Sequence, residues 1–122
     1  DAALVDDAGN AGGLDPDQHF VILGDLNADP VDGSSLGSPI NEFLLSSPRL
    51  ARDPEPSSEI AIERLDATDT ARFRLRVDYV LPSNQIRVLQ SKIWREGHDA
   101  PEGFPSDHFP VWAELAIPCL NK

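Results

Sequence analysis

The chain has 122 residues, of which 40% are hydrophobic and 25% charged, and it carries a single cysteine, Cys119. This is the composition of one small globular domain, and it excludes an internal disulfide and a zinc cluster built on cysteines. Acidic residues outnumber basic ones by 21 to 10, for a formal net charge of −11, so duplex nucleic acid is a poor default partner. We expect no membrane span, since no run approaches the roughly 18 apolar residues that one needs, and we expect an extracytoplasmic or secreted location rather than a cytoplasmic one.

The first part of the sequence predicts a loop, a strand and a helix. Residues 1–18 contain several glycines and aspartates without apolar periodicity, and we expect them to form a loop or linker. The apolar run 20–23 is typical of a strand buried on both faces. After a second loop, Ser38 and Pro39 provide the start signal of a helix that Pro48 would end. The face of this helix that we expect to pack is formed by Ile40, Phe43 and Leu44.

The second part predicts an irregular segment followed by three strands. Residues 51–72 are mostly polar and contain two prolines, which favours a long loop. From residue 73 the apolar period becomes two, which predicts a half-buried strand over residues 73–82. Residues 86–94 would be its antiparallel partner across a short turn, and residues 109–117 would form the last strand. The expected fold is therefore α/β and strand-rich, with a mostly antiparallel sheet.

Polar residues interrupt these strands at three places. Asp25 and Asn27 follow the first strand two residues apart, a spacing at which strand side chains point the same way. Asp78 lies in mid-strand, where a buried and unpaired carboxylate would be costly, and Asp107 and His108 precede the last strand. Taken singly, these residues are typical of a turn, an exposed strand face and a capped loop. Together they supply the carboxylates, amide and imidazole that phosphoester hydrolysis uses.

The three segments that carry these residues resemble a known family. The stretches VILGDLNADP, LRVDYVLPS and SDHFPVWAEL are similar, in this order, to the last three motifs of the endonuclease/exonuclease/phosphatase superfamily, which has the DNase I-like fold. The resemblance covers residues 19–117 and leaves residues 118–122 as a tail. It implies a four-layer α/β sandwich of two similar halves, of which this chain would be the C-terminal half. It also implies a divalent-metal-dependent phosphoesterase whose partner is the missing N-terminal half.

The resemblance assigns a role to each of the five polar residues. Asp25 would orient the attacking water, and Asn27 would bind an oxygen of the phosphate. Asp78 would pair with His108 and fix its orientation, while His108 would contact the scissile phosphate. Asp107 would lie beside the metal, which would be Mg²⁺, Mn²⁺ or Ca²⁺, and Asp25 is a second candidate ligand.

Three alternatives compete with this interpretation. The stretch DLNADPVDG begins like a calcium-binding loop, but Pro30 occupies the position of the required glycine and Leu36 that of the bidentate glutamate. A non-catalytic half-domain that binds or acts as a scaffold remains open, and so does a nuclease that acts on DNA or RNA. The acidic charge favours small or lipid-like phosphoesters over duplex DNA.

The resemblance also implies how the chain would behave by itself. We expect it to be inactive, because the family's glutamate ligand and half of the cleft would be supplied by the other half. We further expect self-association or a covering partner, because a sheet face that packs in the intact domain would be exposed. The apolar residues from which that exposed face would be drawn are Phe73, Leu75, Val77, Phe109, Val111 and Leu115.

Overall fold

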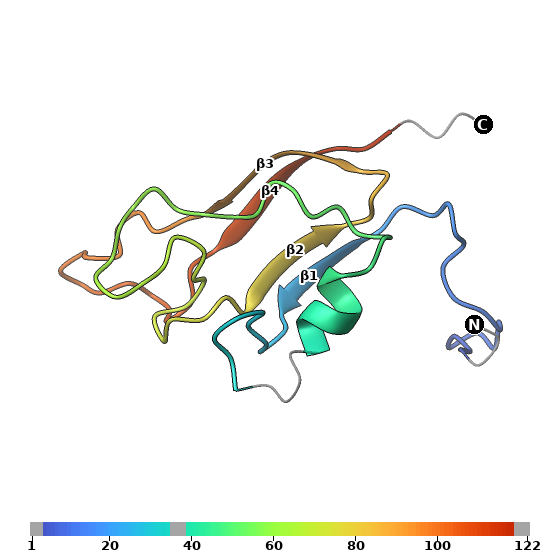
Figure 1. Cartoon of the computed structure of the whole chain (residues 1–122), viewed down its shortest axis with the longest axis horizontal. Helices are drawn as coiled ribbons and strands as arrows, with labels where there is room; N and C mark the ends of the chain where they lie inside the picture. Colours follow the sequence, from blue (N-terminus) through green and yellow to red (C-terminus); the bar gives the residue numbers. More distant parts are fainter. Residues whose placement is uncertain (1–3, 35–38, 119–122) are drawn as a thin grey trace.

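The computed structural model describes residues 4–34 and 39–118. In chain order its elements are β1 (Val21–Asp25), the short helix η1 (Ile40–Leu45), β2 (Asp78–Pro82), β3 (Arg87–Ile93) and β4 (Val111–Ala116). The strands form two antiparallel pairs, β1 with β2 and β3 with β4, and β4 also contacts β2 (Figure 1). Within the described residues, none of the helices has the length and apolar character that a membrane crossing requires.

The two faces of the β1–β2 pair have different surroundings. Residues directly opposite each other in an antiparallel pair lie on the same face, and the register joins Ile22 to Leu81 and Leu23 to Val80. Leu81 belongs to the buried core, with Ile22 packed against it and η1 covering this side (Figure 1). Leu23 on the other face is 68% exposed. One face of the pair therefore forms the core, and the other remains open.

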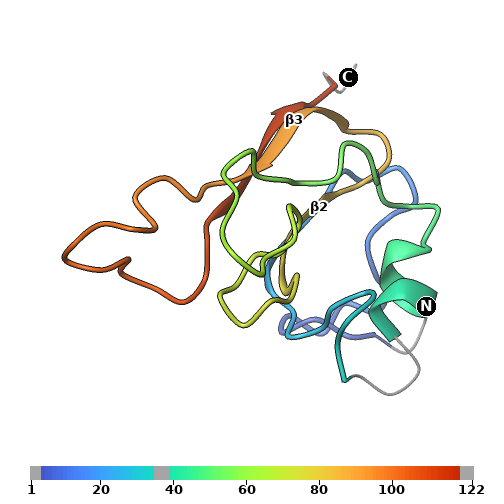
Figure 2. The same cartoon turned by 60° about the vertical axis from the view of Figure 1, so that its left-hand side comes forward.

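The segment between η1 and β2 is irregular, as the sequence predicts. Its shape is held by Arg95, whose guanidinium is buried and donates hydrogen bonds to the carbonyl oxygens of Ile60 (3.2 Å), Asp66 (2.6 Å) and Asp69 (2.7 Å). Burial lowers the pKa of Arg95, and the carbonyl dipoles replace part of its lost hydration. The orange loop before β4 projects away from the rest of the chain (Figure 2).

The strand expected over residues 73–82 begins only at Asp78, and its partner differs from the prediction. Arg74 has a positive φ of 64°, which breaks the extended conformation. The N–H groups of Val77 and Asp78 donate to the hydroxyl of Thr70 rather than to a neighbouring strand. The expected pairing of β2 with residues 86–94 is wrong. β2 pairs with β1, and β3, which lies within residues 86–94, pairs with β4. The apolar period fixes which residues face the core but not which strand lies alongside.

Three further expectations about packing are corrected. The helix is short and ends at Leu45, well before Pro48, and Phe43 is 78% exposed. The proposed cap Ser38 lies outside the described residues. The first strand is not buried on both faces, since Leu23 is exposed on the open face. Of the apolar set from which an exposed face would be drawn, Phe73 is 45% exposed, whereas Val77 and Phe109 are buried by this chain's own residues.

Candidate functional site

A groove of about 450 Å³ lies between the open face of the β1–β2 pair and the segment that leads into β4. Opposite residues Asp25 and Asp78 stand at one end of the strand pair, and His108 faces them from the segment before β4. The lining residues are Leu23, Gly24, Asp25, Asp78, Tyr79, Val80, Ser106, His108, Phe109, Pro110 and Val111. The groove therefore joins an apolar wall to a polar end.

The polar end is built on a hydrogen bond between Asp78 and His108. The Nδ1 atom of His108 lies 2.8 Å from Oδ2 of Asp78. An ionised carboxylate can only accept, so Nδ1 carries the proton and Nε2 is left for another partner. The main-chain N–H of His108 donates to Ser106 Oγ (3.0 Å), and the ring of Phe73 meets the imidazole edge-on at 5.3 Å between centroids. The expected pairing of Asp78 with His108 is confirmed.

The acidic surroundings favour the charged imidazole. The hydrogen bond to Asp78 raises the pKa of His108 above its ordinary value and outweighs the opposing effect of burial. The negative charges of Asp78, Asp107 and Asp25 act in the same direction. His108 therefore remains a cation to a higher pH than a solvent-exposed histidine does. A cationic Nε2–H is a strong donor to a phosphate oxygen.

Thr70 holds the two partners of this hydrogen bond in place. Its side-chain oxygen accepts the N–H groups of Val77 (2.9 Å) and Asp78 (3.0 Å). Its carbonyl oxygen accepts the N–H of Phe109 (2.7 Å), next to His108. Thr70 is fully buried. One residue thus fixes the start of β2 relative to the segment that carries the histidine.

Asp25, Asp78 and His108 form a cluster that could hold a cation. A carboxylate oxygen of Asp25, one of Asp78 and a ring nitrogen of His108 all lie within 4.8 Å of one another. A ring nitrogen ligates a metal only when it carries no proton, so with His108 charged the two carboxylates are the ligands. Carboxylates directly opposite each other repel, so a positive ion between Asp25 and Asp78 would relieve this repulsion. Oxygen donors of this kind suit Mg²⁺, Mn²⁺ and Ca²⁺. The donor set therefore fits a divalent cation.

Asn27 and Asp107 lie beside this cluster rather than in it. β1 ends at Asp25, and Asn27 has a positive φ of 49°, so the two-residue period that would align their side chains no longer applies. The N–H of Asn27 instead donates to Oδ1 of Asp25 (2.8 Å), and its side chain is exposed. Asp107 is exposed, and its carbonyl oxygen accepts the N–H of Arg72 (2.8 Å). Neither residue lines the groove as far as the described residues define it.

Sequence reasoning missed the residues that support the site from behind. Thr70 and Phe73 lie in segments interpreted as loop and strand, and Asp29 lies in the loop expected after the first strand. The signal available for Asp29 was its place four residues after Asp25 in the same motif. Nothing in the sequence pattern distinguishes Thr70 from an ordinary loop threonine, because its role depends on hydrogen bonds to residues seven and eight positions away.

Comparisons with known proteins agree with the geometry. Residues 1–108 match the sequence model of the Endonuclease/Exonuclease/phosphatase family. Neither the curated proteins nor the solved structures contain a match to the chain. The family match spans most of the chain and ends on His108, so that it includes Asp25, Asn27, Asp78 and Asp107. The chain therefore belongs to the endonuclease/exonuclease/phosphatase family, whose enzymes cleave phosphoester bonds.

Proposed function

We propose that this chain carries the catalytic face of a divalent-metal-dependent phosphoesterase. The observation that supports this most directly is the hydrogen-bonded pair of Asp78 and His108 facing Asp25 across the end of one groove. A bound divalent cation would neutralise charge on the phosphate and activate its oxygens. Magnesium is the first candidate, because it prefers one or two carboxylates together with water and phosphate oxygens.

In this proposal the side chains have complementary roles. His108 donates from Nε2 to a non-bridging oxygen of the phosphate, and Asp78 holds the ring in the required tautomer. Asp25 accepts a hydrogen bond from the attacking water and orients it toward phosphorus. Asn27 binds a second phosphate oxygen. Asp107, which is exposed beside the cluster, would have to turn toward the groove to contribute a ligand to the cation. Placing Asn27 at the phosphate requires its exposed side chain to turn toward the groove, which its position after the strand end permits.

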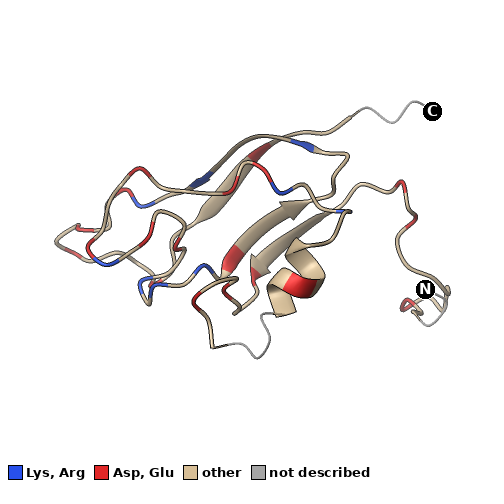
Figure 3. Ribbon diagram, in the orientation of Figure 1, with Lys and Arg blue, Asp and Glu red and all other residues tan. Residues whose placement is uncertain are grey.

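The substrate that best fits the groove is a small or lipid-like phosphoester. Apolar side chains of Leu23, Val80 and Val111 form the wall that leads away from the acidic end, and such a wall suits an apolar leaving group. Acidic residues are distributed along the whole ribbon (Figure 3), and the net charge of −11 disfavours a long polyanion. A nuclease that acts on DNA or RNA is therefore the less favoured member of the same reaction class.

We propose further that an N-terminal half of the domain completes the site. The open face of β1–β2, with Leu23 68% exposed, would face a second half in the four-layer sandwich, and the substrate would lie between the two in the groove. That half would supply the remaining metal ligand and the opposite wall of the cleft. Positioning the substrate and excluding water both depend on that wall.

The test is a hydrolysis assay with two chromogenic esters. p-Nitrophenyl phosphate and bis-p-nitrophenyl phosphate would be supplied with millimolar Mg²⁺ or Mn²⁺ to the full-length protein, with and without a chelator. We expect chelator-sensitive release of nitrophenol that Asp25→Ala abolishes. Asp17→Ala removes an exposed carboxylate before the other end of β1 and serves as the matched control. Metal-independent turnover, or equal activity in both variants, would overturn the proposal.

A further inference from the structure

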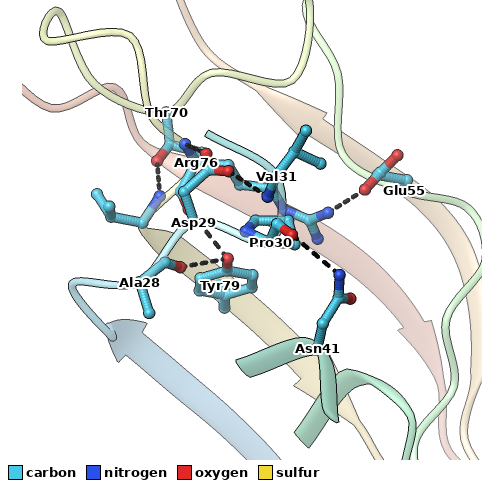
Figure 4. Close-up of polar contacts among 10 residues, drawn as sticks. Ala28, Asp29, Pro30, Val31, Asn41, Glu55, Thr70, Arg76 and Tyr79 are labelled. Atoms are coloured by element: carbon cyan, nitrogen blue, oxygen red, sulfur yellow. Dashed lines mark hydrogen bonds and ion pairs between the residues drawn. The ribbon is translucent and has the colours of Figure 1, made fainter. Parts of the chain in front are cut away.

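The loop that leaves β1 is anchored by a buried carboxylate, that of Asp29. Asp29 is only 5% exposed, although it lies in a loop of an acidic protein. Its Oδ1 atom accepts the N–H groups of Val31 (2.6 Å) and Asp32 (2.7 Å), which closes the turn that follows it. Its Oδ2 atom accepts the N–H of Arg76 (2.6 Å), which lies 47 residues further along the chain (Figure 4).

The bond to Arg76 joins the two segments that carry the acidic end of the groove. Asp29 follows Asp25 by four residues, and Arg76 precedes Asp78 by two. The ladder between β1 and β2 ends at the pair Asp25 and Asp78. Beyond that pair, the carboxylate of Asp29 continues the connection by accepting the main-chain N–H of Arg76.

Two other contacts hold the loop after β1 against β2 and the segment that leads into it. The N–H of Leu26 donates to the carbonyl oxygen of Val77 (2.8 Å). The hydroxyl of Tyr79 lies 2.7 Å from the carbonyl oxygen of Ala28 and 2.9 Å from that of Arg76, and its one proton can be given to either (Figure 4). Burial raises the pKa of Tyr79 to about 12, so the hydroxyl stays neutral and remains a donor.

The environment of Asp29 favours its ionised form. Burial alone would raise the pKa of Asp29, but the hydrogen bonds from Asp32, Arg76 and Val31 outweigh it and hold the pKa below its ordinary value. The positive charge of the Arg76 guanidinium lowers the pKa of Asp29 further. This guanidinium also forms an ion pair with Glu55, and its Cζ atom lies 4.9 Å from the centroid of the Tyr79 ring. At neutral pH the carboxylate of Asp29 is therefore ionised, and both of its oxygens accept hydrogen bonds.

We propose that Asp29 is a positioning residue for the phosphoesterase reaction proposed above, on which this inference rests. Through its bond to the Arg76 N–H, it fixes the segment of Asp25 and Asn27 relative to the Asp78–His108 pair. The hydrogen bond holds the backbone that carries Asp25 and Asn27 in place relative to the segment of the Asp78–His108 pair. A displacement of about 1 Å among such groups is enough to slow a reaction by roughly 100-fold.

The test compares variants of Asp29 with a variant at the opposite end of the same strand pair. Asp29→Asn keeps the shape of the side chain but can place an amide N–H against the main-chain N–H of Arg76. Asp29→Ser keeps an oxygen that can close the turn, but the side chain is too short to reach Arg76. Ser83→Ala is the matched control, because Ser83 is also fully buried and its Oγ accepts the N–H of Phe20 at the start of β1 (3.3 Å). All would be made in the full-length protein and assayed at equal folded fraction.

We expect both Asp29 variants to lower kcat by roughly 10- to 100-fold with KM within about 3-fold of the wild type, because positioning acts on the reacting groups. Ser83→Ala should keep kcat within about 3-fold of the wild-type value, because it loosens the strand pair at the end away from the reacting groups. Folded Asp29 variants with wild-type kcat would overturn the proposal, and so would an equal loss of kcat in Ser83→Ala.

A second measurement separates this proposal from the proposed function. Amide hydrogen exchange should show Leu26 and Asn27 protected in the wild type and exchanging at least 10-fold faster in the Asp29 variants, while Val80 keeps its protection. A wild type without turnover would reject the proposed function alone. Unchanged exchange at Leu26 and Asn27 would reject the positioning role, whatever the activity.

Discussion

At the scale of single residues, the site depends on the charge of His108. Its raised pKa has its largest cause in the hydrogen bond that Nδ1–H donates to Asp78, so Asp78→Asn should lower the pKa toward that of an ordinary histidine. The stabilisation that the charged form gives the fold is fully present below about pH 6.5 and is lost as the pH rises through the raised pKa. NMR titration of the imidazole in chelator-treated buffer measures the shift.

The control for this titration is Asp107→Asn. Asp107 acts on His108 through charge alone, and this charge is a smaller cause than the hydrogen bond to Asp78. Its variant should lower the pKa less than Asp78→Asn does. Equal shifts in the two variants would mean that the hydrogen bond is not the main cause.

The two residues assigned to the phosphate give a second prediction. Asn27→Ala and His108→Ala should each slow the chemical step by roughly 10²–10³-fold, the cost of removing one preorganised group that stabilises charge. Single-turnover kinetics in the full-length protein measures this step. His19→Ala removes a half-buried histidine before the other end of β1 and should leave the rate unchanged. An Asn27 variant with full turnover would make Asn27 a turn residue only.

The residue scale also shows what the sequence can and cannot predict about the site. The partner of Asp78 was implied by the family resemblance, which pairs it with the histidine of the third motif, although Asp78 is the first residue of β2 and not a mid-strand residue as expected. The direction of the Asn27 side chain could not be predicted, because it depends on the strand ending at Asp25 and on the positive φ of Asn27 two residues later. The roles of Asp29 and Thr70 come from contacts between distant segments, which local patterns do not contain.

At the scale of elements, the sequence located the four strands with errors at their ends. It did not predict which strands pair with each other. Alternation marks which residues face the core, so Tyr79 and Leu81 were identified correctly on one face of β2. Alternation says nothing about which strand lies alongside. The short turn after Pro82 suggested a hairpin, whereas Ser83 donates its N–H to Phe20 and thereby joins β2 to the start of β1. Pairing is decided by packing and register across the whole sheet.

Thr70 joins the start of β2 to the segment before β4, and its removal should be costly. Thr70→Val leaves the buried N–H groups of Val77 and Asp78 without an acceptor, which should lower the free energy of unfolding by about 2 kcal/mol or more. Urea denaturation followed by circular dichroism measures the change. Thr68→Val, at a half-buried position two residues earlier, should change it by less than about 0.5 kcal/mol. Equal stability of the two variants would contradict the role given to Thr70.

At the scale of the whole molecule, one face of the β1–β2 pair is packed and the other is open. The apolar wall of the groove and the exposed Leu23 lie on the open face, whereas Val77 and Phe109 are already covered by this chain. Contiguous apolar surface of this kind drives association. The 122-residue chain should therefore self-associate through the groove face when a second half does not cover it, and its catalysis should be weak or absent because the cleft has one wall.

The measurement is the mass in solution by sedimentation, beside a chromogenic assay with millimolar Mn²⁺. Leu23→Lys places a charge on the open face and should raise the monomer fraction, because a lysine there would have to be desolvated on association. Leu4→Lys is the matched control, since Leu4 is 58% exposed but lies in the N-terminal segment away from the groove. If both lysine variants behave alike, the associating surface is elsewhere. If the isolated wild-type chain is a monomer with chelator-sensitive turnover, the site is complete within these 122 residues, and the groove already has the walls that the reaction needs.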